Sequence, residues 1–284
     1  MTLRALAACA VAAALCGCAA PEPATGAKTS IPISMMKPDG AGPFPAVVLL
    51  HDCSGLGPSS SHAPARWARE LVKQGYVVAI PDSFTTRGHA DGVCVDPSPS
   101  RNDVAPFRRV PDAYEALAYL RALPYVDGAR VGVMGGSHGG ATTVATMALL
   151  ANDSQATLEG KRHGFAAAVA FYPACNIGAP RFTTRYAAAA PMLILIGELD
   201  DWTPAAPCLR LVEASRAGGA PVSIKVYPGA HHSFDSASPL YYNPNRVNAN
   251  APGGRGATTA GNSTAWADSV HEVTAFFGRY LKAQ

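Results

Sequence analysis

The chain has 284 residues and 48% of them are hydrophobic, which is enough to bury one large α/β core or two small ones. Charged residues make up only 15% of the sequence, and the formal net charge is +3. The sequence contains no basic run and no charged helix face, so we expect no nucleic-acid partner.

The N-terminus reads as a targeting segment. Arg4 supplies a positive start, and the apolar run at residues 5–15 is far shorter than the roughly 20 residues that a membrane span needs. Cys18 follows in a pattern that resembles a bacterial lipoprotein signal. We therefore predict a signal peptide at residues 1–17, lipidation of Cys18 as a membrane anchor, and a flexible tether at residues 18–30. An ordinary cleaved secretory signal is the alternative, which would leave a soluble periplasmic or secreted protein; both place the protein outside the cytoplasm.

Apart from Cys9, Cys16 and Cys18 in the signal region, four of the seven cysteines remain: Cys53, Cys94, Cys175 and Cys208. An even number of cysteines in an oxidising compartment indicates two disulfides. Four cysteines allow three pairings. We predict Cys53–Cys94 and Cys175–Cys208, because each pair would join two loops at the same edge of a sheet. No C-x-x-C spacing suggests a zinc site, and we expect no metal.

Apolar runs alternate with helical patterns through residues 31–284, which we expect to form a single domain without repeats or linkers. This alternation predicts an α/β fold with a mainly parallel central sheet, helices on both faces, and a site at the carboxyl ends of the strands. The predicted strands are residues 31–37, 45–51, 76–80, 129–133, 165–171, 192–196 and 222–227, and the predicted helices are residues 65–74, 107–123, 141–150, 205–217 and 266–281.

Three polar segments show no clear periodicity. Residues 83–102 read as a long loop without secondary structure, and such loops are usually functional or mobile. Residues 152–164 are predicted to form a polar segment between two elements of the domain. Residues 241–264 are rich in Asn, Pro and Gly, so we expect an irregular surface segment there.

The most informative motif is Gly135-Gly136-Ser137-His138-Gly139, a G-x-S-x-G pattern between a β-branched run and a helical segment. In this setting the pattern is typical of a nucleophile elbow, a tight turn that presents the serine hydroxyl. Glycines are needed around the serine because a Cβ there would collide with the neighbouring strand or helix. Ser137 is therefore the candidate nucleophile.

A nucleophilic serine needs a base, and the base needs a carboxylate that orients it. In this fold class the order along the chain is serine, acid, histidine. Asp200 follows a predicted strand and is the candidate acid, whereas Asp201 is better suited to cap the next helix. His232 follows the last predicted strand and is the candidate base, with His231 as its packed or solvent-facing neighbour.

The tetrahedral intermediate needs two N–H donors. We predict that they are the backbone N–H groups of His138, directly after the nucleophile, and of Cys53, in the loop after an early strand. Asp52 could tune the charge near the serine or stabilise its own turn, and the sequence leaves both open. Candidate pocket residues are Trp202, Phe84 and Tyr172, with Arg87 as a possible contact for an anionic substrate.

These segments together resemble the dienelactone hydrolase family of α/β-hydrolases. The matching segments are residues 47–55, 76–82, 135–140, 197–204 and 227–234, which span most of the mature chain in the family's order. The run Tyr-Pro-Gly-Ala-x-His-Ser-Phe is the most specific of them. The resemblance implies the same hydrolase fold, with the family's histidine at His232, its acid at Asp200 and its oxyanion donors at Cys53 and His138.

The sequence departs from the best-known members of that family at three positions. Ser137 stands where they have cysteine, Asp52 where they have glutamate, and Ser236 near their substrate-binding arginine. A serine nucleophile in an exported protein favours a general carboxylic-ester hydrolase acting on a small-molecule ester without a cofactor. The alternatives are a peptidase or acyltransferase on the same triad, and an inactive envelope-anchored binding lipoprotein.

Overall fold

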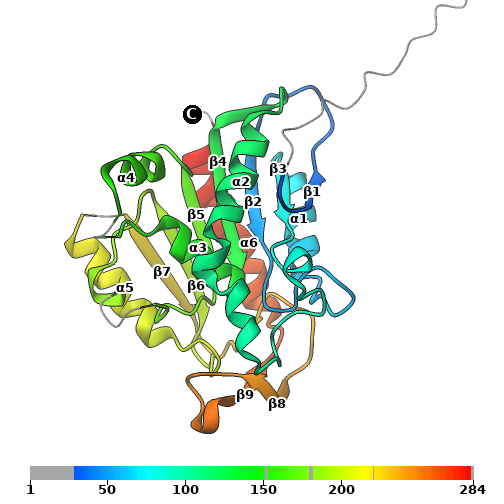
Figure 1. Cartoon of the computed structure of the whole chain (residues 1–284), viewed down its shortest axis with the longest axis vertical. Coiled ribbons are helices and arrows are strands. Elements are labelled where there is room, and N and C mark those ends of the chain that lie inside the picture. The colour runs from blue at the N-terminus through cyan, green and yellow to red at the C-terminus, as the bar shows by residue number, and fades with distance from the viewer. Residues whose placement is uncertain (1–28, 151–152, 179–181, 220, 283–284) are drawn as a thin grey trace, which may run out of the picture.

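The computed structural model describes residues 29–150, 153–178, 182–219 and 221–282 (Figure 1). The predicted signal peptide, Cys18 and the tether up to residue 28 lie outside this part of the chain. Ser30, at the end of the predicted tether, already donates a hydrogen bond to Glu115 (2.6 Å). None of the helices in the described part is long and apolar enough to cross a membrane.

A seven-stranded sheet forms the centre of the domain, in the order β1-β3-β2-β4-β5-β6-β7. β1 is antiparallel to β3, and the other neighbours are parallel, which confirms the predicted mainly parallel sheet. The central strands are almost wholly buried because helices cover both faces. The strands are β1 (Ile33–Met36), β2 (Phe44–Leu50), β3 (Val77–Pro81), β4 (Val126–Gly136), β5 (Ala167–Phe171), β6 (Met192–Gly197) and β7 (Val222–Tyr227).

The helices cover the sheet in two layers (Figure 1). α1 (Ala63–Lys73) and α6 (Ser263–Leu281) share one face, where the rings of Trp67 and Trp266 lie 4.7 Å apart. α6 packs closely because β4 has a glycine there: a Cβ on Gly132 would lie 2.8 Å from the side chain of Leu281. The other face carries α2 (Val110–Arg121), α3 (His138–Met147) and α5 (Ala205–Ala217).

The strand order explains why the site forms where it does. The chain runs from β2 outward to β3 and then returns to place β4 on the other side of β2. The loops that follow β2 and β4 therefore leave the sheet side by side and in opposite lateral directions. Such a switch point opens a crevice at the carboxyl ends of the strands, and Cys53 and Ser137 follow these two strands.

Residues 241–264 do not form the predicted irregular segment. β8 (Tyr241–Val247) and β9 (Arg255–Thr259) pair antiparallel as a hairpin, which Figure 1 shows in orange at the end of the molecule. β8 is largely exposed, and β9 is short and rich in Gly, Ala and Thr, so no apolar alternation marks the hairpin in the sequence. The hairpin is held instead by hydrogen bonds to the domain, including Trp202 Nε1 to the Val247 carbonyl (2.9 Å) and Val247 N–H to the Cys94 carbonyl (2.9 Å).

The other two polar segments also contain secondary structure. The region expected to be one long loop contains the short 3₁₀ helices η1 (Thr85–Arg87) and η2 (Pro99–Val104), and η3 (Pro106–Arg109) precedes α2. The polar segment predicted at residues 152–164 contains α4 (Gln155–Arg162). Ser154 caps α4 by accepting the Thr157 N–H (3.1 Å). A serine in this position favours a helix start, but the apolar periodicity of the following residues was too weak to predict the helix.

Candidate active site

Ser137 occupies a sharp turn between the end of β4 and the start of α3. Its backbone has φ 54° and ψ −116°, a conformation that L residues rarely adopt. The turn needs glycine on both sides: a Cβ on Gly135 would lie 2.5 Å from the Gly139 backbone, and one on Gly139 would lie 2.1 Å from the Leu50 carbonyl oxygen. This is the geometry of a nucleophile elbow, with the serine at the N-terminus of α3.

Ser137, His232 and Asp200 form one continuous hydrogen-bonded chain. Ser137 Oγ lies 2.9 Å from His232 Nε2, and His232 Nδ1 lies 2.8 Å from Asp200 Oδ2. All three residues are buried. The arrangement can move the hydroxyl proton to the imidazole while the carboxylate stabilises the resulting imidazolium. The structure thus brings together three residues that follow β4, β6 and β7.

The Asp200 carboxylate is fixed by its own loop. Oδ1 accepts the N–H groups of Trp202 (3.0 Å) and Thr203 (2.8 Å). The Thr203 hydroxyl donates to the Tyr172 carbonyl at 2.9 Å or to Asp200 Oδ2 at 3.0 Å, and it also lies 3.0 Å from His232 Nδ1. No role for Thr203 is predicted from the sequence. Its only signal was its place three residues after the candidate acid.

Asp201 does not cap α5 as expected. Pro204 occupies the N-cap position, and no side chain caps the helix there. Asp201 instead turns toward the hairpin, where its carboxylate accepts the Thr258 N–H (2.8 Å) and the Thr258 hydroxyl (2.7 Å). Two adjacent aspartates therefore point to different elements, Asp200 to the histidine and Asp201 to β9.

The predicted oxyanion donors, Cys53 and His138, lie on the two loops that meet beside Ser137. The N–H groups of Cys53 and His138 have no hydrogen-bond acceptor within the described residues. Both residues line the same cavity as the serine. Both N–H groups are therefore unpaired beside the serine, which is what donors to a developing oxyanion require.

A fully buried arginine, Arg109, joins these two loops. Its guanidinium donates to the His51 carbonyl at 2.9 Å and to His138 Nδ1 at 2.8 Å. Burial lowers the pKa of Arg109 to about 9 and, with the adjacent guanidinium, holds the pKa values of His51 and His138 well below 6.5. Both imidazoles are therefore neutral. Arg109 lay in a predicted helical stretch and gave no sequence signal of this contact.

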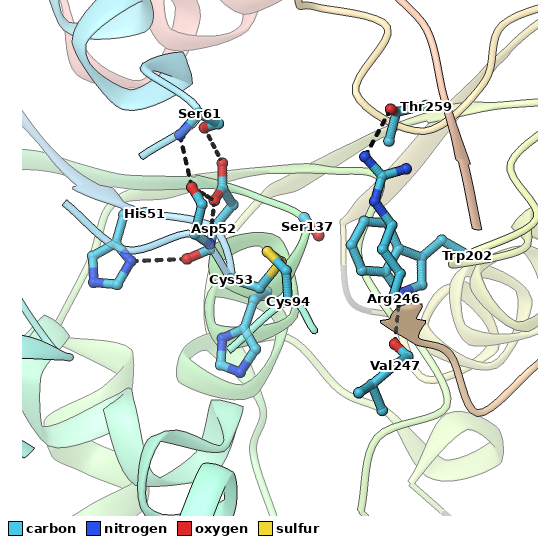
Figure 2. The surroundings of a disulfide bond; sticks show 12 residues. His51, Asp52, Cys53, Ser61, Cys94, Ser137, Trp202, Arg246, Val247 and Thr259 are labelled. Atoms are coloured by element: carbon cyan, nitrogen blue, oxygen red, sulfur yellow. Dashed lines mark hydrogen bonds between the residues drawn. A yellow bond between two sulfur atoms is a disulfide. The ribbon is translucent and has the colours of Figure 1, made fainter. Parts of the chain in front are cut away.

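Two cavities open on Ser137. They have volumes of about 370 and 300 Å³, and both are lined by Cys53, Cys94, Ser137 and Trp202. Figure 2 shows the serine hydroxyl between the disulfide on one side and Trp202, stacked with Arg246, on the other. The larger cavity includes His138 and not His232, whereas the smaller one includes His232 and not His138. The disulfide, Ser137 and Trp202 thus lie between the cavity that includes His138 and the cavity that includes His232.

Of the four predicted pocket residues, only Trp202 lines these cavities. Phe84 is fully buried, with its ring 4.5 Å from that of His51. Tyr172 is buried, lies against the His232 ring (4.6 Å) and donates to Asp235 at 2.7 Å. These two aromatic side chains support the site from behind and do not line either cavity.

Arg87 is also not placed to bind substrate. Its guanidinium makes two hydrogen bonds of 2.7 Å to the carboxylate of Asp112. Asp112 raises the Arg87 pKa through these bonds. The expected contact with an anionic substrate is therefore wrong, because Asp112 already pairs with this charge and Arg87 lines neither cavity at the serine.

Asp52 stabilises its own turn. Its carboxylate accepts the Ser54 N–H at 2.7 Å, and the hydroxyl of Ser61 also donates to it. This favours the turn-stabilising alternative. Among the described residues, Asp52 groups with Cys53 and Cys94 closely enough to hold a metal, but both sulfurs belong to a disulfide and are not free thiolates.

Both predicted disulfides are present, Cys53–Cys94 and Cys175–Cys208. The first ties the candidate oxyanion loop to the loop that precedes η2, next to Ser137 (Figure 2). The second ties the loop after β5 to α5. The first joins two loops, as predicted, whereas the second joins a loop to the first turn of a helix.

The chain is similar to known proteins over most of its length. A relative from Methylorubrum extorquens, provisionally named carboxymethylenebutenolidase, is 26% identical over 223 residues, which are 72% of this chain and 68% of the relative. A provisionally named dienelactone hydrolase from Klebsiella pneumoniae has a TM-score of 0.62 at 20% identity, covering 88% of this chain and 93% of its own. The apo form of Thermogutta terrifontis esterase 2 has a TM-score of 0.60 at 18% identity, covering 89% and 91%.

At these identities, the two solved structures show a shared fold. The model of the dienelactone hydrolase family matches residues 31–281, which is nearly all of the part that the structure describes. The elbow, the three-residue chain and the strand order described above all lie within that range. The protein therefore belongs to the dienelactone hydrolase family, a family of α/β-hydrolases.

Proposed function

We propose that this protein is a serine esterase that cleaves carboxylic esters through an acyl-enzyme on Ser137. Ser137 Oγ attacks the ester carbonyl carbon while its proton passes to His232 Nε2, and Asp200 stabilises the imidazolium. The carbonyl oxygen becomes an oxyanion that accepts the N–H groups of Cys53 and His138. The C–O bond to the alcohol then breaks, and the alcohol leaves with the proton from His232. Water repeats the sequence on the acyl-enzyme and releases the acid.

One observation carries this proposal: the unbroken hydrogen-bonded chain from Ser137 Oγ through His232 to Asp200, at 2.9 and 2.8 Å. A serine held at positive φ is a strained arrangement that the fold maintains with close glycine packing. Membership of a hydrolase family agrees with the same chemistry. An inactive binding lipoprotein would not need either feature.

The test compares Ser137→Ala with Ser223→Ala, a serine on β7 outside both cavities. We expect Ser137→Ala to lower kcat for p-nitrophenyl acetate by about 10⁶ while the far-UV spectrum stays that of the folded protein. A fluorophosphonate probe should label the wild type and Ser223→Ala and leave Ser137→Ala unlabelled. Equal labelling or turnover in Ser137→Ala would exclude this nucleophile.

The same acyl-enzyme could pass its acyl group to an alcohol or be formed from a peptide, so the assay includes both competitors. With a serine esterase, added alcohol acceptors divert little product and peptide substrates are not cleaved. Dominant transfer to the alcohol would assign an acyltransferase, and efficient peptide cleavage would assign a peptidase.

We also propose that the protein is exported and anchored to the cell envelope through lipidated Cys18. The two disulfides support export, because such bonds persist in oxidising compartments. A Cys18→Ser variant should move from the membrane fraction to the soluble envelope fraction. If the wild type is itself soluble and unlabelled by a fatty-acid probe, the signal is an ordinary secretory one.

A further inference from the structure

If Ser137 cleaves esters, as proposed above, the two cavities hold different parts of the substrate. This assignment depends on that proposed function. The alcohol oxygen must lie within hydrogen-bond reach of His232 Nε2, because it leaves with the proton that this nitrogen carries. The cavity of about 300 Å³ includes His232, whereas the other includes His138 and thus the oxyanion side. The smaller cavity is therefore the place of the alcohol part.

The smaller cavity is lined mainly by polar side chains from three separate segments: the loop after β2, the loop after β7, and the hairpin. Serine is the commonest residue in the lining. The hydroxyls of Ser59, Ser233 and Ser238 have no hydrogen-bond partner within the described residues. The lining thus offers several free groups that can each donate and accept a hydrogen bond.

Arg246 of β8 adds a fixed donor to this lining. Its guanidinium lies over the Trp202 ring at 5.0 Å and donates to Thr259 Oγ1 at 3.0 Å (Figure 2). It also donates to the Ala257 carbonyl at 3.0 Å. No carboxylate pairs with it among the described residues. The carboxylate of Asp52 lies in the same lining and supplies an acceptor. The lining of this cavity therefore contains both donors and acceptors.

An exposed aromatic side chain stands beside this cavity. Tyr241 is 55% exposed, and its ring lies 5.7 Å from the Arg246 guanidinium. Alternate residues of a strand share a face, so Tyr241 lies on the same face of β8 as Asn243, which lines the cavity. An exposed tyrosine ring can stack on the C–H face of a sugar ring, because one side of the phenol is apolar.

We propose that the alcohol part of the substrate is a carbohydrate, so that the enzyme removes acyl groups from sugar hydroxyls. A sugar presents several hydroxyls that match the free serines, Arg246 and Asp52, and a C–H face that matches Tyr241. A simple alkyl alcohol would displace water from these polar groups without replacing its hydrogen bonds, which weakens binding. The sugar oxygen that carries the acyl group then lies toward His232 Nε2.

The first experiment compares acetate release from 6-O-acetylglucose, whose other hydroxyls are free, from a partly acetylated xylose oligosaccharide and from ethyl acetate. Each kcat/KM is divided by the rate of uncatalysed alkaline hydrolysis, because a sugar is a better leaving group than ethanol. We expect the normalised kcat/KM for both sugar esters to exceed that for ethyl acetate by at least about tenfold, the effect of one or two added hydrogen bonds.

The second experiment uses Tyr241→Ser and Tyr242→Ser as a matched pair. Tyr242 is the next residue on β8, is equally exposed at 57%, and faces the opposite way, over Gly256. We expect Tyr241→Ser to lower kcat/KM for the acetylated oligosaccharide about tenfold more than for ethyl acetate. Tyr242→Ser should leave kcat/KM unchanged for both the acetylated oligosaccharide and ethyl acetate. Arg246→Gln should likewise lower kcat/KM for the acetylated oligosaccharide more than kcat/KM for ethyl acetate.

The outcomes separate the two proposals. Equal normalised values for sugar and alkyl esters would overturn the carbohydrate assignment, while continued hydrolysis of p-nitrophenyl acetate would leave the esterase intact. Equal effects of the two tyrosine variants would overturn the placement of the sugar chain over Tyr241. If no ester of any kind is cleaved and Ser137 resists the fluorophosphonate probe, both proposals fail.

Discussion

The guanidinium of Arg109 lies 2.8 Å from Nδ1 of His138, the residue directly after the proposed nucleophile. Because a guanidinium can only donate, Nδ1 must accept, and the proton of this neutral imidazole sits on Nε2. The same guanidinium holds the His51 carbonyl at 2.9 Å. One buried cation thus fixes the strand-exit loop of β2 against the first turn of α3.

Removing this cation should affect both stability and turnover. Arg109→Met leaves the His51 carbonyl and His138 Nδ1 buried without donors, so we expect the free energy of unfolding to fall by about 2–4 kcal/mol. We also expect kcat for p-nitrophenyl acetate to fall about tenfold, as the proposed oxyanion donors lose their alignment. Urea titration and steady-state kinetics measure the two effects.

Arg121→Met provides the control for that substitution. Arg121 also donates to carbonyls, those of Gly128, His163 and Gly164, but it does so at the far end of α2. It should cost about 1 kcal/mol of stability and leave kcat within twofold of wild type. If both arginine variants lower kcat equally, Arg109 acts through general stability and not through the loops at the site.

Acid should destabilise the protein below about pH 6.5. Burial holds the pKa values of His51 and His138 below their value of 6.5 in the unfolded chain, so the unfolded state binds more protons in this range. The contribution of these two histidines to the free energy of unfolding is therefore complete above pH 6.5 and is lost as the pH falls below it. For two such histidines the loss from pH 7.5 to 5.5 is about 2–3 kcal/mol by urea titration.

The histidine contribution can be isolated by substitution. In His51→Gln one of the two groups no longer titrates, so the loss between pH 7.5 and 5.5 should shrink by about 1.4 kcal/mol. His271→Gln places the same substitution at an exposed position of α6 and is the matched control: the loss between pH 7.5 and 5.5 should be larger there than in His51→Gln. An undiminished loss in His51→Gln would show that His51 does not contribute to acid unfolding.

The two disulfides should differ in their effect on catalysis. The double variant Cys53→Ala/Cys94→Ala frees the loop that carries a proposed oxyanion donor, so we expect kcat to fall at least about tenfold. Cys175→Ala/Cys208→Ala removes the bond between the β5 exit loop and α5, and kcat should stay within about threefold. Each variant should lose about 2–4 kcal/mol of stability. Equal losses of kcat would contradict a local effect of the first disulfide.

The tight elbow predicts opposite outcomes for two glycine substitutions. Gly139→Ala places a Cβ 2.1 Å from the Leu50 carbonyl oxygen, both of them backbone, and should destabilise the protein by about 3 kcal/mol or more. Gly160→Ala, in α4, meets nothing within 4 Å and should stabilise it by about 0.5–1 kcal/mol. Thermal melts of the two variants check the signs, and a neutral Gly139→Ala would show that the elbow can relax.

The paired aspartates provide a test of the proposed acid. Asp200→Asn should lower kcat by about 10⁴, because the amide no longer stabilises the imidazolium and favours the wrong histidine tautomer. Asp201→Asn weakens only the bond to Thr258 of the hairpin and should retain most of kcat. A larger loss in Asp201→Asn than in Asp200→Asn would reverse the assignment.

The sequence by itself determined the features that are written in local patterns. Buried apolar runs specified the parallel strands, and the spacing of Val273, Phe277 and Leu281 specified the last helix. The glycines around Ser137 specified the elbow, because no other residue fits there. The family's order of segments placed Asp200 and His232, and the cysteines could be paired from their places at one edge of the sheet.

Only the tertiary structure decided which side chains line the cavities and which support them from behind. The loops that carry Phe84, Tyr172 and Arg87 favour a place in the pocket for each of them. In the structure Phe84 and Tyr172 are buried in the core, and Arg87 pairs with Asp112. Arg109, Thr203 and the hairpin act through contacts with residues far along the chain, including Trp202 with Val247. Such contacts have no periodicity and no fixed spacing, because they depend on how separate loops meet in space.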